Sequence, residues 1–85
     1  MTGAQLRAAR ALLGWSAQTL ASASGVGITT IRKNELANGP VTMIRANIEV
    51  LTRTLETAGV EFIPDDGSGS GSGSGVRLRN RAGAE

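Results

Sequence analysis

Apolar side chains recur with the period of an α-helix at the start of the chain. Leu6, Ala9 and Leu13 stand at i, i+3 and i+7, which places them on one face of a helix. Thr2 and Gln5 have the three-residue spacing of a capping box, in which each side chain bonds the backbone of the other residue. The pattern predicts a first helix that begins just after Thr2.

A second helix is predicted to begin after Ser16. Gly14 can end the first helix, and Ser16 is a residue type that caps helix N-termini. Trp15 and Leu20 flank this cap at the two positions of a hydrophobic staple, a contact that fixes how the chain enters a helix. We therefore expect Trp15 to lie in the core and not to stack on a nucleic-acid base.

A glycine turn is predicted between the second helix and a third. In Gly25-Val26-Gly27, Gly25 can adopt a positive φ without steric cost, and Val26 is expected to be buried between the two helices. Gly27 is an acceptable N-cap for the next helix. The third helix is expected to begin at Gly27 or Ile28 and to be closed by Asn38-Gly39-Pro40. Residues 14–39 thus have the order of elements of a helix-turn-helix.

A fourth, amphipathic helix is predicted between Thr42 and Gly59. Thr42 is its expected N-cap and Gly59 its expected end. Its apolar positions repeat at i, i+4, i+7 and i+11 and are Ile44, Ile48, Leu51 and Leu55.

Two short strands are predicted after the fourth helix. Val60–Ile63 is rich in strand-forming residues and is stopped by Pro64, and Val76–Arg79 alternates apolar and basic side chains. Between them, residues 67–75 alternate Gly and Ser, a composition that cannot pack a core and behaves as a flexible tether.

Three arrangements of these strands are compatible with the sequence. They can pair within one chain around a loop of about a dozen residues, which is long for a hairpin. They can pair between two chains across a two-fold axis, with dimer contacts from Val60, Phe62, Val76 and Leu78. Alternatively, the last residues form a free basic arm that touches DNA phosphates through Arg77, Arg79 and Arg81.

The expected fold class is mostly α, with four or five helices and a short C-terminal β segment or hairpin. The helical domain spans residues 1–59. A short strand and turn, a flexible linker, and a basic strand with a disordered tail follow, over residues 60–66, 67–75 and 76–85.

The composition removes several classes of chemistry. The 85 residues contain no Cys and no His, which excludes disulfides, zinc-type ligand sets and the usual general base near neutral pH. Glu49, Glu56 and Glu61 show no convergent spacing with a nucleophile or a metal set, so we expect no enzyme activity, no cofactor and no metal. No run of about 18 apolar residues occurs, so no membrane partner is expected, and the expected location is the cytoplasm, at the nucleoid.

Charge is distributed unevenly around the net value of +2. Residues 1–47 hold five basic side chains against one acidic one, a net +4, whereas residues 48–66 hold one against five, a net −4. Residues 67–85 hold three against one, a net +2. A basic segment that coincides with the predicted helix-turn-helix is what binding to nucleic-acid phosphates requires.

In order and spacing, these residues resemble the DNA-binding domain of the lambda-repressor-like, or XRE, family of bacterial and phage regulators. The resemblance covers residues 1 to about 58 and rests on Leu6, Arg10, Leu13-Gly14-Trp15-Ser16, Leu20-Ala21, Gly25-Val26, Thr30-Ile31, Glu35 and Gly39. It implies a lambda-repressor-like helix-turn-helix fold. It also implies an ion pair between Arg10 and Glu35 that ties the first helix to the end of the recognition helix.

The expected base contacts come from the third helix. Ile28 can contact a thymine methyl, or it can pack against the second helix. Thr29 can hydrogen-bond to a base edge, and Arg32 or Lys33 can donate to guanine O6 and N7. The expected phosphate contacts are Arg10, Ser16, Gln18, Asn38, Thr42 and Arg45.

Two positions depart from the family pattern. Many members carry Gln where this chain has Ala17, and the neighbouring Gln18 is rotated by about 100° around the helix. The position of Asn34 is often apolar. If Asn34 faces the core, its side-chain amide needs hydrogen-bond partners. Alternatively, Asn34 lies at the rim of the core, or Leu36 packs there in its place.

Two functions are therefore compared. The first is a sequence-specific DNA-binding transcriptional regulator, a homodimeric repressor or autoregulator that binds an inverted-repeat operator in double-stranded DNA through the helix starting near Ile28. The second is an antitoxin or other protein-interaction module that binds a partner protein, with DNA binding secondary. The departures at Ala17 and Asn34 are the features that keep the second function open.

Overall fold

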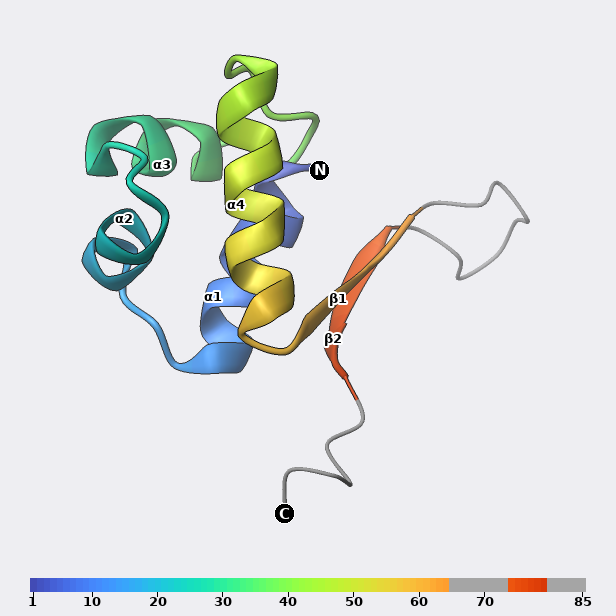
Figure 1. The fold of residues 1–85 in the computed structure, drawn as a ribbon. Coiled ribbons are helices and arrows are strands. Elements are labelled where there is room, and N and C mark those ends of the chain that lie inside the picture. Colours follow the sequence, from blue (N-terminus) through green and yellow to red (C-terminus); the bar gives the residue numbers. More distant parts are fainter. Residues whose placement is uncertain (65–73, 80–85) are drawn as a thin grey trace.

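The computed structural model describes residues 1–64 and 74–79, which form four α-helices and a two-stranded antiparallel sheet (Figure 1). The elements are α1 (Gly3–Leu13), α2 (Ala17–Ser24), α3 (Ile28–Glu35), α4 (Arg45–Thr57), β1 (Val60–Ile63) and β2 (Gly75–Leu78). Most of the predicted tether and of the predicted tail lie outside the described residues. Among residues 1–64 and 74–79, none of the helices combines the length and the apolar character that a membrane span requires.

The predicted caps of α1 and α2 are confirmed. Thr2 and Gln5 form the capping box, with Oγ1 of Thr2 accepting from the Gln5 backbone at 3.0 Å and Oε1 of Gln5 accepting from the Thr2 backbone at 2.9 Å. Ser16 caps α2 by accepting from the Thr19 backbone at 3.0 Å. Gly14 follows α1 with a φ of 69°, a conformation that glycine adopts without strain.

The turn between α2 and α3 also matches the prediction. Gly25 has a φ of 81° at the end of α2, and Gly27 is the N-cap of α3, without a side-chain hydrogen bond. Val26 is only 5% exposed and belongs to the core between the two helices.

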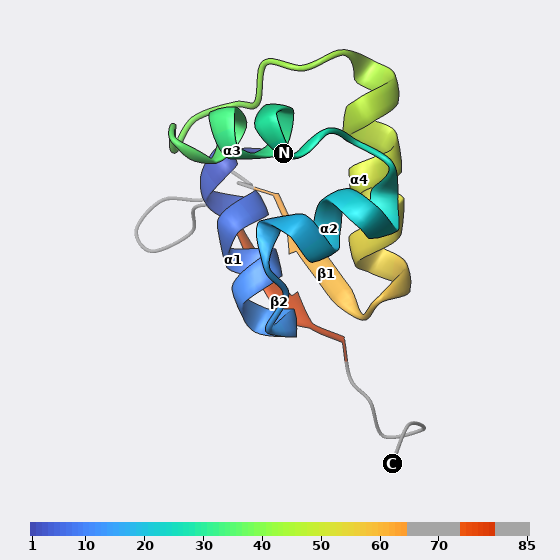
Figure 2. The same ribbon diagram turned by 90° about the vertical axis from the view of Figure 1, so that its left-hand side faces the viewer.

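The hydrophobic core lies where the four helices and the sheet meet (Figure 2). Its fully buried large side chains come from every helix and from β1 and are Leu6, Leu20, Ile31, Leu51, Leu55 and Val60. Trp15 is half-buried and packs against this cluster, as expected of a core residue.

The predicted start of α4 is wrong. The helix begins at Arg45, with Ile44 as an N-cap that makes no side-chain bond, and Thr42 lies outside it. Thr42 is engaged elsewhere, because its backbone N–H donates to Oδ1 of the buried Asn34 at 2.7 Å. Ile44, predicted on the core stripe, is therefore 68% exposed.

The third helix ends earlier than predicted, at Glu35 and not at Asn38-Gly39-Pro40. After Glu35 the chain leaves the helix axis and runs beside the N-terminal residues. The Gly3 N–H donates to the Gly39 carbonyl at 2.9 Å, and Thr2 forms a β-bridge with Pro40. Gly3 is required at this crossing, since a Cβ there would lie 2.0 Å from the Ala37 carbonyl oxygen.

The two strands pair with each other within the chain, which is the first of the three arrangements predicted from the sequence. They are antiparallel, with Val60 opposite Leu78 and Phe62 opposite Val76. The sheet packs on α1 and on α4, and the Gln5 side-chain amide donates to the Ile63 carbonyl at 3.3 Å and the Gly75 carbonyl at 3.0 Å.

The free-arm arrangement is wrong for Arg77 and Arg79. Arg77 pairs with Glu61 at 2.9 Å across the hairpin, and Arg79 donates to the Glu56 carbonyl at 2.8 Å. Arg81 lies outside the described residues.

Candidate nucleic-acid interface

The third helix has two clearly different faces. Ile31, Asn34 and Glu35 are buried against the rest of the domain. The exposed positions are Thr29, Arg32, Lys33 and Leu36, the last of them the C-cap. Among the described residues, the Arg32 and Lys33 side chains make no hydrogen bond or ion pair, so both cations are free to meet a ligand. Ile28, at the N-terminus of α3, is half-buried against the core.

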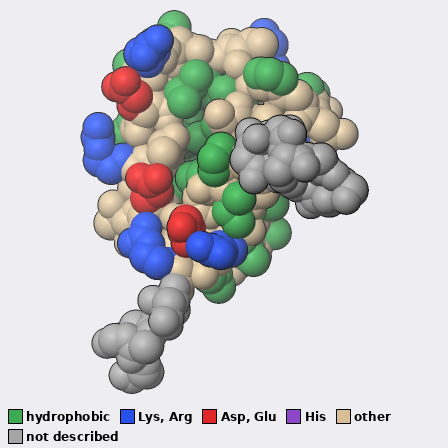
Figure 3. All heavy atoms as spheres, turned by 90° about the vertical axis from the view of Figure 1, so that its right-hand side faces the viewer, with side chains coloured by type: hydrophobic (Ala, Val, Ile, Leu, Met, Phe, Trp, Pro, Cys, Tyr) green, Lys and Arg blue, Asp and Glu red, His purple; other side chains and the backbone are tan. Residues whose placement is uncertain are grey.

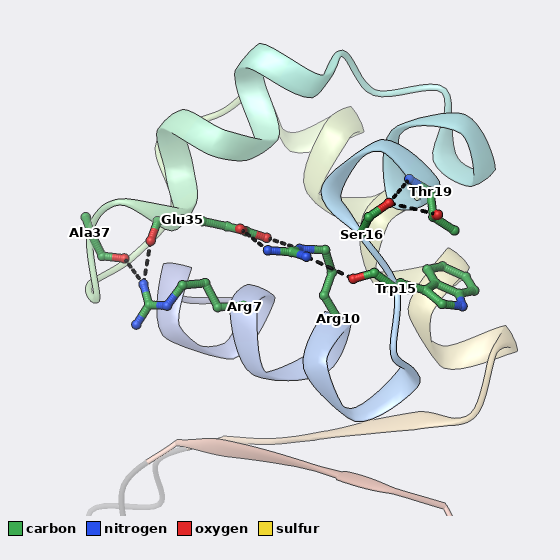
Figure 4. Close-up of polar contacts among 7 residues, drawn as sticks. All are labelled: Arg7, Arg10, Trp15, Ser16, Thr19, Glu35 and Ala37. Carbon is green, nitrogen blue, oxygen red and sulfur yellow. Dashed lines mark hydrogen bonds and ion pairs between the residues drawn. The ribbon is translucent and has the colours of Figure 1, made fainter.

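A bidentate ion pair fixes the C-terminal end of α3 to α1. Nε and Nη2 of Arg10 each donate to a carboxylate oxygen of Glu35 at 2.8 Å (Figure 4). Nη1 of Arg10 donates to the Trp15 carbonyl at 2.9 Å, so all three guanidinium nitrogens are engaged within the chain. The hydrogen bond from Glu35 is the main cause that raises the pKa of Arg10. The pair expected from the family resemblance is thus present, and its first role is to position α3.

Asn34 forms a second joint beneath α3. Its Nδ2 donates to the Thr30 carbonyl at 2.9 Å, and its Oδ1 accepts from the Thr42 backbone, so the buried amide has partners on both sides. The buried polar side-chain atoms of the described residues are all hydrogen-bonded. The alternative in which Leu36 takes over the packing is wrong, because Leu36 is 87% exposed.

Arg7 makes a third contact that holds α3, and its role was not predicted from the sequence. Its Nη1 donates to the carbonyls of Glu35 and Ala37 (Figure 4). Its Nη2 donates to Oδ1 of Asn38 at 2.6 Å. A cation at the end of a helix also interacts favourably with the helix dipole. The available signal was the spacing from Arg10: residues three apart share one helix face, so both arginines could reach α3.

The expected phosphate contacts lie around α3 and are exposed, apart from the half-buried Arg10. Ser16 caps α2, and Gln18 on its first turn donates to the Ser22 hydroxyl at 3.4 Å. Thr42 and Asn38 lie on the segment between α3 and α4, with Asn38 held by Arg7. Arg45 is the first residue of α4.

Residues expected at a dimer interface differ in their availability. Val60 is fully buried inside the chain, and Phe62 and Val76 are partly buried against the core. Leu78 is 45% exposed and presents the most surface of the four.

Charge separates the α3 side of the molecule from the rest. Glu35 is balanced by Arg10, and among the described residues no acid pairs with Arg7, with Arg32 and Lys33 of α3, or with Arg45 at the start of α4. The face viewed in Figure 3 differs, since acidic and basic side chains lie side by side there.

The site offers hydrogen-bond donors, cations and methyl groups on a rigidly held helix. Within the described ranges, no group of three or more acidic, His or Cys side chains could hold a metal ion. Comparison with known proteins finds neither a protein-family model nor a curated protein that matches this chain.

Proposed function

We propose that this protein is a sequence-specific DNA-binding transcriptional regulator. In this proposal α2 and α3 act as a helix-turn-helix of the lambda-repressor-like kind, and α3 enters the major groove of double-stranded DNA. In this proposal the protein is a homodimeric repressor or autoregulator that binds an inverted-repeat operator.

The observation that carries the proposal is the exposed face of α3. Thr29, Arg32 and Lys33 supply a hydroxyl and two cations that match the donor and acceptor pattern of base edges. The buried face is held by the joints of Glu35 and Asn34, so the exposed side chains are presented by a fixed helix. Such preorganisation reduces the cost of ordering on binding.

The homodimer follows from the size of the contact. A single short recognition helix reaches few base pairs, so discrimination in a genome requires a second half-site about 34–36 Å away, one turn along the duplex. The basic character of the α3 side supplies the phosphate contacts that all sequences share.

Selection of bound duplexes from a random pool, with the full chain, tests this function. We expect an enriched inverted repeat whose binding weakens steeply as salt is raised. Lys33→Ala should cost about 1–3 kcal/mol on the selected site and relax preference at one position.

Arg53→Ala is the matched control, because it removes one exposed cation from α4 and leaves α3 unchanged. It should leave both affinity and preference close to wild type. Failure to enrich any motif would overturn the proposal, and an equal loss for Lys33→Ala on all sequences would reassign Lys33 to phosphate.

A protein-interaction module, such as an antitoxin, is the second candidate. It is favoured by an apolar groove of about 400 Å³ between α2 and α4, lined by Trp15, Ala23, Val50, Arg53, Thr54, Thr57 and Ala58. Co-purification with the product of a neighbouring gene, lost on Arg53→Glu at the groove rim while DNA binding is unchanged, would support it over a stand-alone regulator.

A further inference from the structure

Leu36, the C-cap of α3, lies at the C-terminal end of the exposed face of this helix. It follows Thr29 by seven residues, so the two lie about 20° apart around the helix axis, and Arg32 and Lys33 flank this line by about 40–60° on either side. The α-helical backbone conformation of Leu36, with φ −69° and ψ −26°, continues the helix geometry to this position. Leu36 therefore supplies an apolar side chain at the end of the exposed face of α3, with the cations of Arg32 and Lys33 on either side of its line.

The fold makes no use of the Leu36 side chain. It is 87% exposed, the highest value among the exposed large apolar side chains of residues 1–64 and 74–79. Asn34 and Glu35, on the opposite face, make the contacts that hold this end of the helix. Exposed apolar surface on a face that is otherwise polar is a typical mark of an interaction site.

The two cations beside Leu36 restrict the kind of partner that can bind over its side chain. In a two-fold contact between copies of α3, Arg32 and Lys33 would be brought against the same residues of the partner, and like charges at close range oppose association. The acidic wall of the DNA major groove instead complements both cations. The apolar group that this groove displays is the C5-methyl of thymine.

We propose that Leu36 contacts a thymine methyl in the major groove and is a specificity-determining residue of the site. The inference rests on the proposed function and extends it by naming the chemistry that is recognised. A thymine at one position of each half-site is preferred because its methyl and the Leu36 side chain bury apolar surface against each other. Burying one methyl changes the dissociation constant by about fourfold.

The test compares thymine with deoxyuridine, which lacks only that methyl. Each thymine of the selected operator is replaced in turn by deoxyuridine, and dissociation constants are measured for wild type, Leu36→Ala and Leu36→Met. One replacement should weaken wild type by about fourfold and should not weaken Leu36→Ala further. Leu36→Met keeps an apolar contact and should regain sensitivity to the methyl.

Leu12→Ala on α1 is the matched control, because it truncates the same exposed side-chain type away from α3. It should respond to every replacement as wild type does. If a motif is enriched but Leu36→Ala and wild type lose equally at every replacement, the inference is wrong and the DNA-binding function stands. If no motif is enriched, the function itself fails.

Discussion

Two arginine–glutamate pairs of the same geometry differ in burial, and this difference predicts their contributions to stability. Arg10–Glu35 and Arg77–Glu61 are both bidentate, with shortest separations of 2.8 and 2.9 Å. The side chains of the first pair are 22% and 8% exposed, whereas those of the second are 64% and 44% exposed. Geometry alone would predict equal contributions.

Removal of Glu35 leaves the Arg10 guanidinium without its charge partner at a half-buried position. Breaking a fully buried pair costs about 3–5 kcal/mol. Because Arg10 retains some contact with water and keeps its bond to the Trp15 carbonyl, we expect about 2–3 kcal/mol for Glu35→Ala. For the exposed pair, solvent screening should leave a coupling too small to measure.

The assay is urea unfolding of two double-mutant cycles built from alanine variants of the two pairs. Each cycle isolates the pairwise coupling, since losses of packing cancel between single and double variants. We expect about 1.5–3 kcal/mol of coupling for Arg10 with Glu35, with the slope of unfolding free energy against urea unchanged. Equal coupling in the two cycles would refute the argument that burial decides the strength of the pair.

Further predictions concern the contacts that join distant parts of the chain. Gly3→Ala should lower the free energy of unfolding by about 2–3 kcal/mol, measured by urea unfolding, because its Cβ would overlap backbone oxygens of residues 34 and 37. Asn34→Ala should cost about 1–2 kcal/mol in the same assay, since the Thr42 N–H loses its acceptor; no loss would show that water replaces the amide. Gln5→Ala should raise amide hydrogen exchange in the hairpin more than in α2, because the side chain bonds carbonyls of both strands. The hydrogen bond from Arg77 lowers the pKa of Glu61, so the pairing is intact above the ordinary carboxyl pKa and is lost as pH falls through the lowered value. Carboxyl chemical shifts should place the Glu61 midpoint below its value in Arg77→Ala.

Local interactions were predictable where both partners lie within one turn of helix. The capping box of Thr2 with Gln5, the Ser16 cap and the turn at Gly25 each depend on residues three positions apart or fewer, and all three are present. Their stability depends on residue type and spacing, which the sequence states directly.

Contacts between distant residues were not predictable in the same way. Thr42 has the residue type of an N-cap, but its backbone N–H donates to the buried Asn34, and the observed N-cap is Ile44, two residues later. The hairpin partner of Val60–Ile63 could be named, but its location in the same chain depended on the packing of both strands against α1. Arg7 illustrates the same difficulty, because its spacing from Arg10 places both side chains on one helix face but does not identify the carbonyls, about 30 residues away, that Arg7 bonds.

The hydrogen bonds and the ion pair that hold α3 are made by side chains that do not belong to its exposed face. Arg10 with Glu35, Asn34 with Thr42, and Arg7 with the last carbonyls act from the buried side and from the helix end. Substitutions at Thr29, Arg32, Lys33 and Leu36 should therefore change unfolding free energies by no more than about 0.5 kcal/mol, the range of exposed surface positions. Glu35→Ala should instead lower stability and weaken the proposed DNA binding together, because it removes the ion pair that fixes α3 to α1. A set of surface variants that lost binding and stability in proportion would show that the exposed face also holds the fold, contrary to the arrangement of these joints.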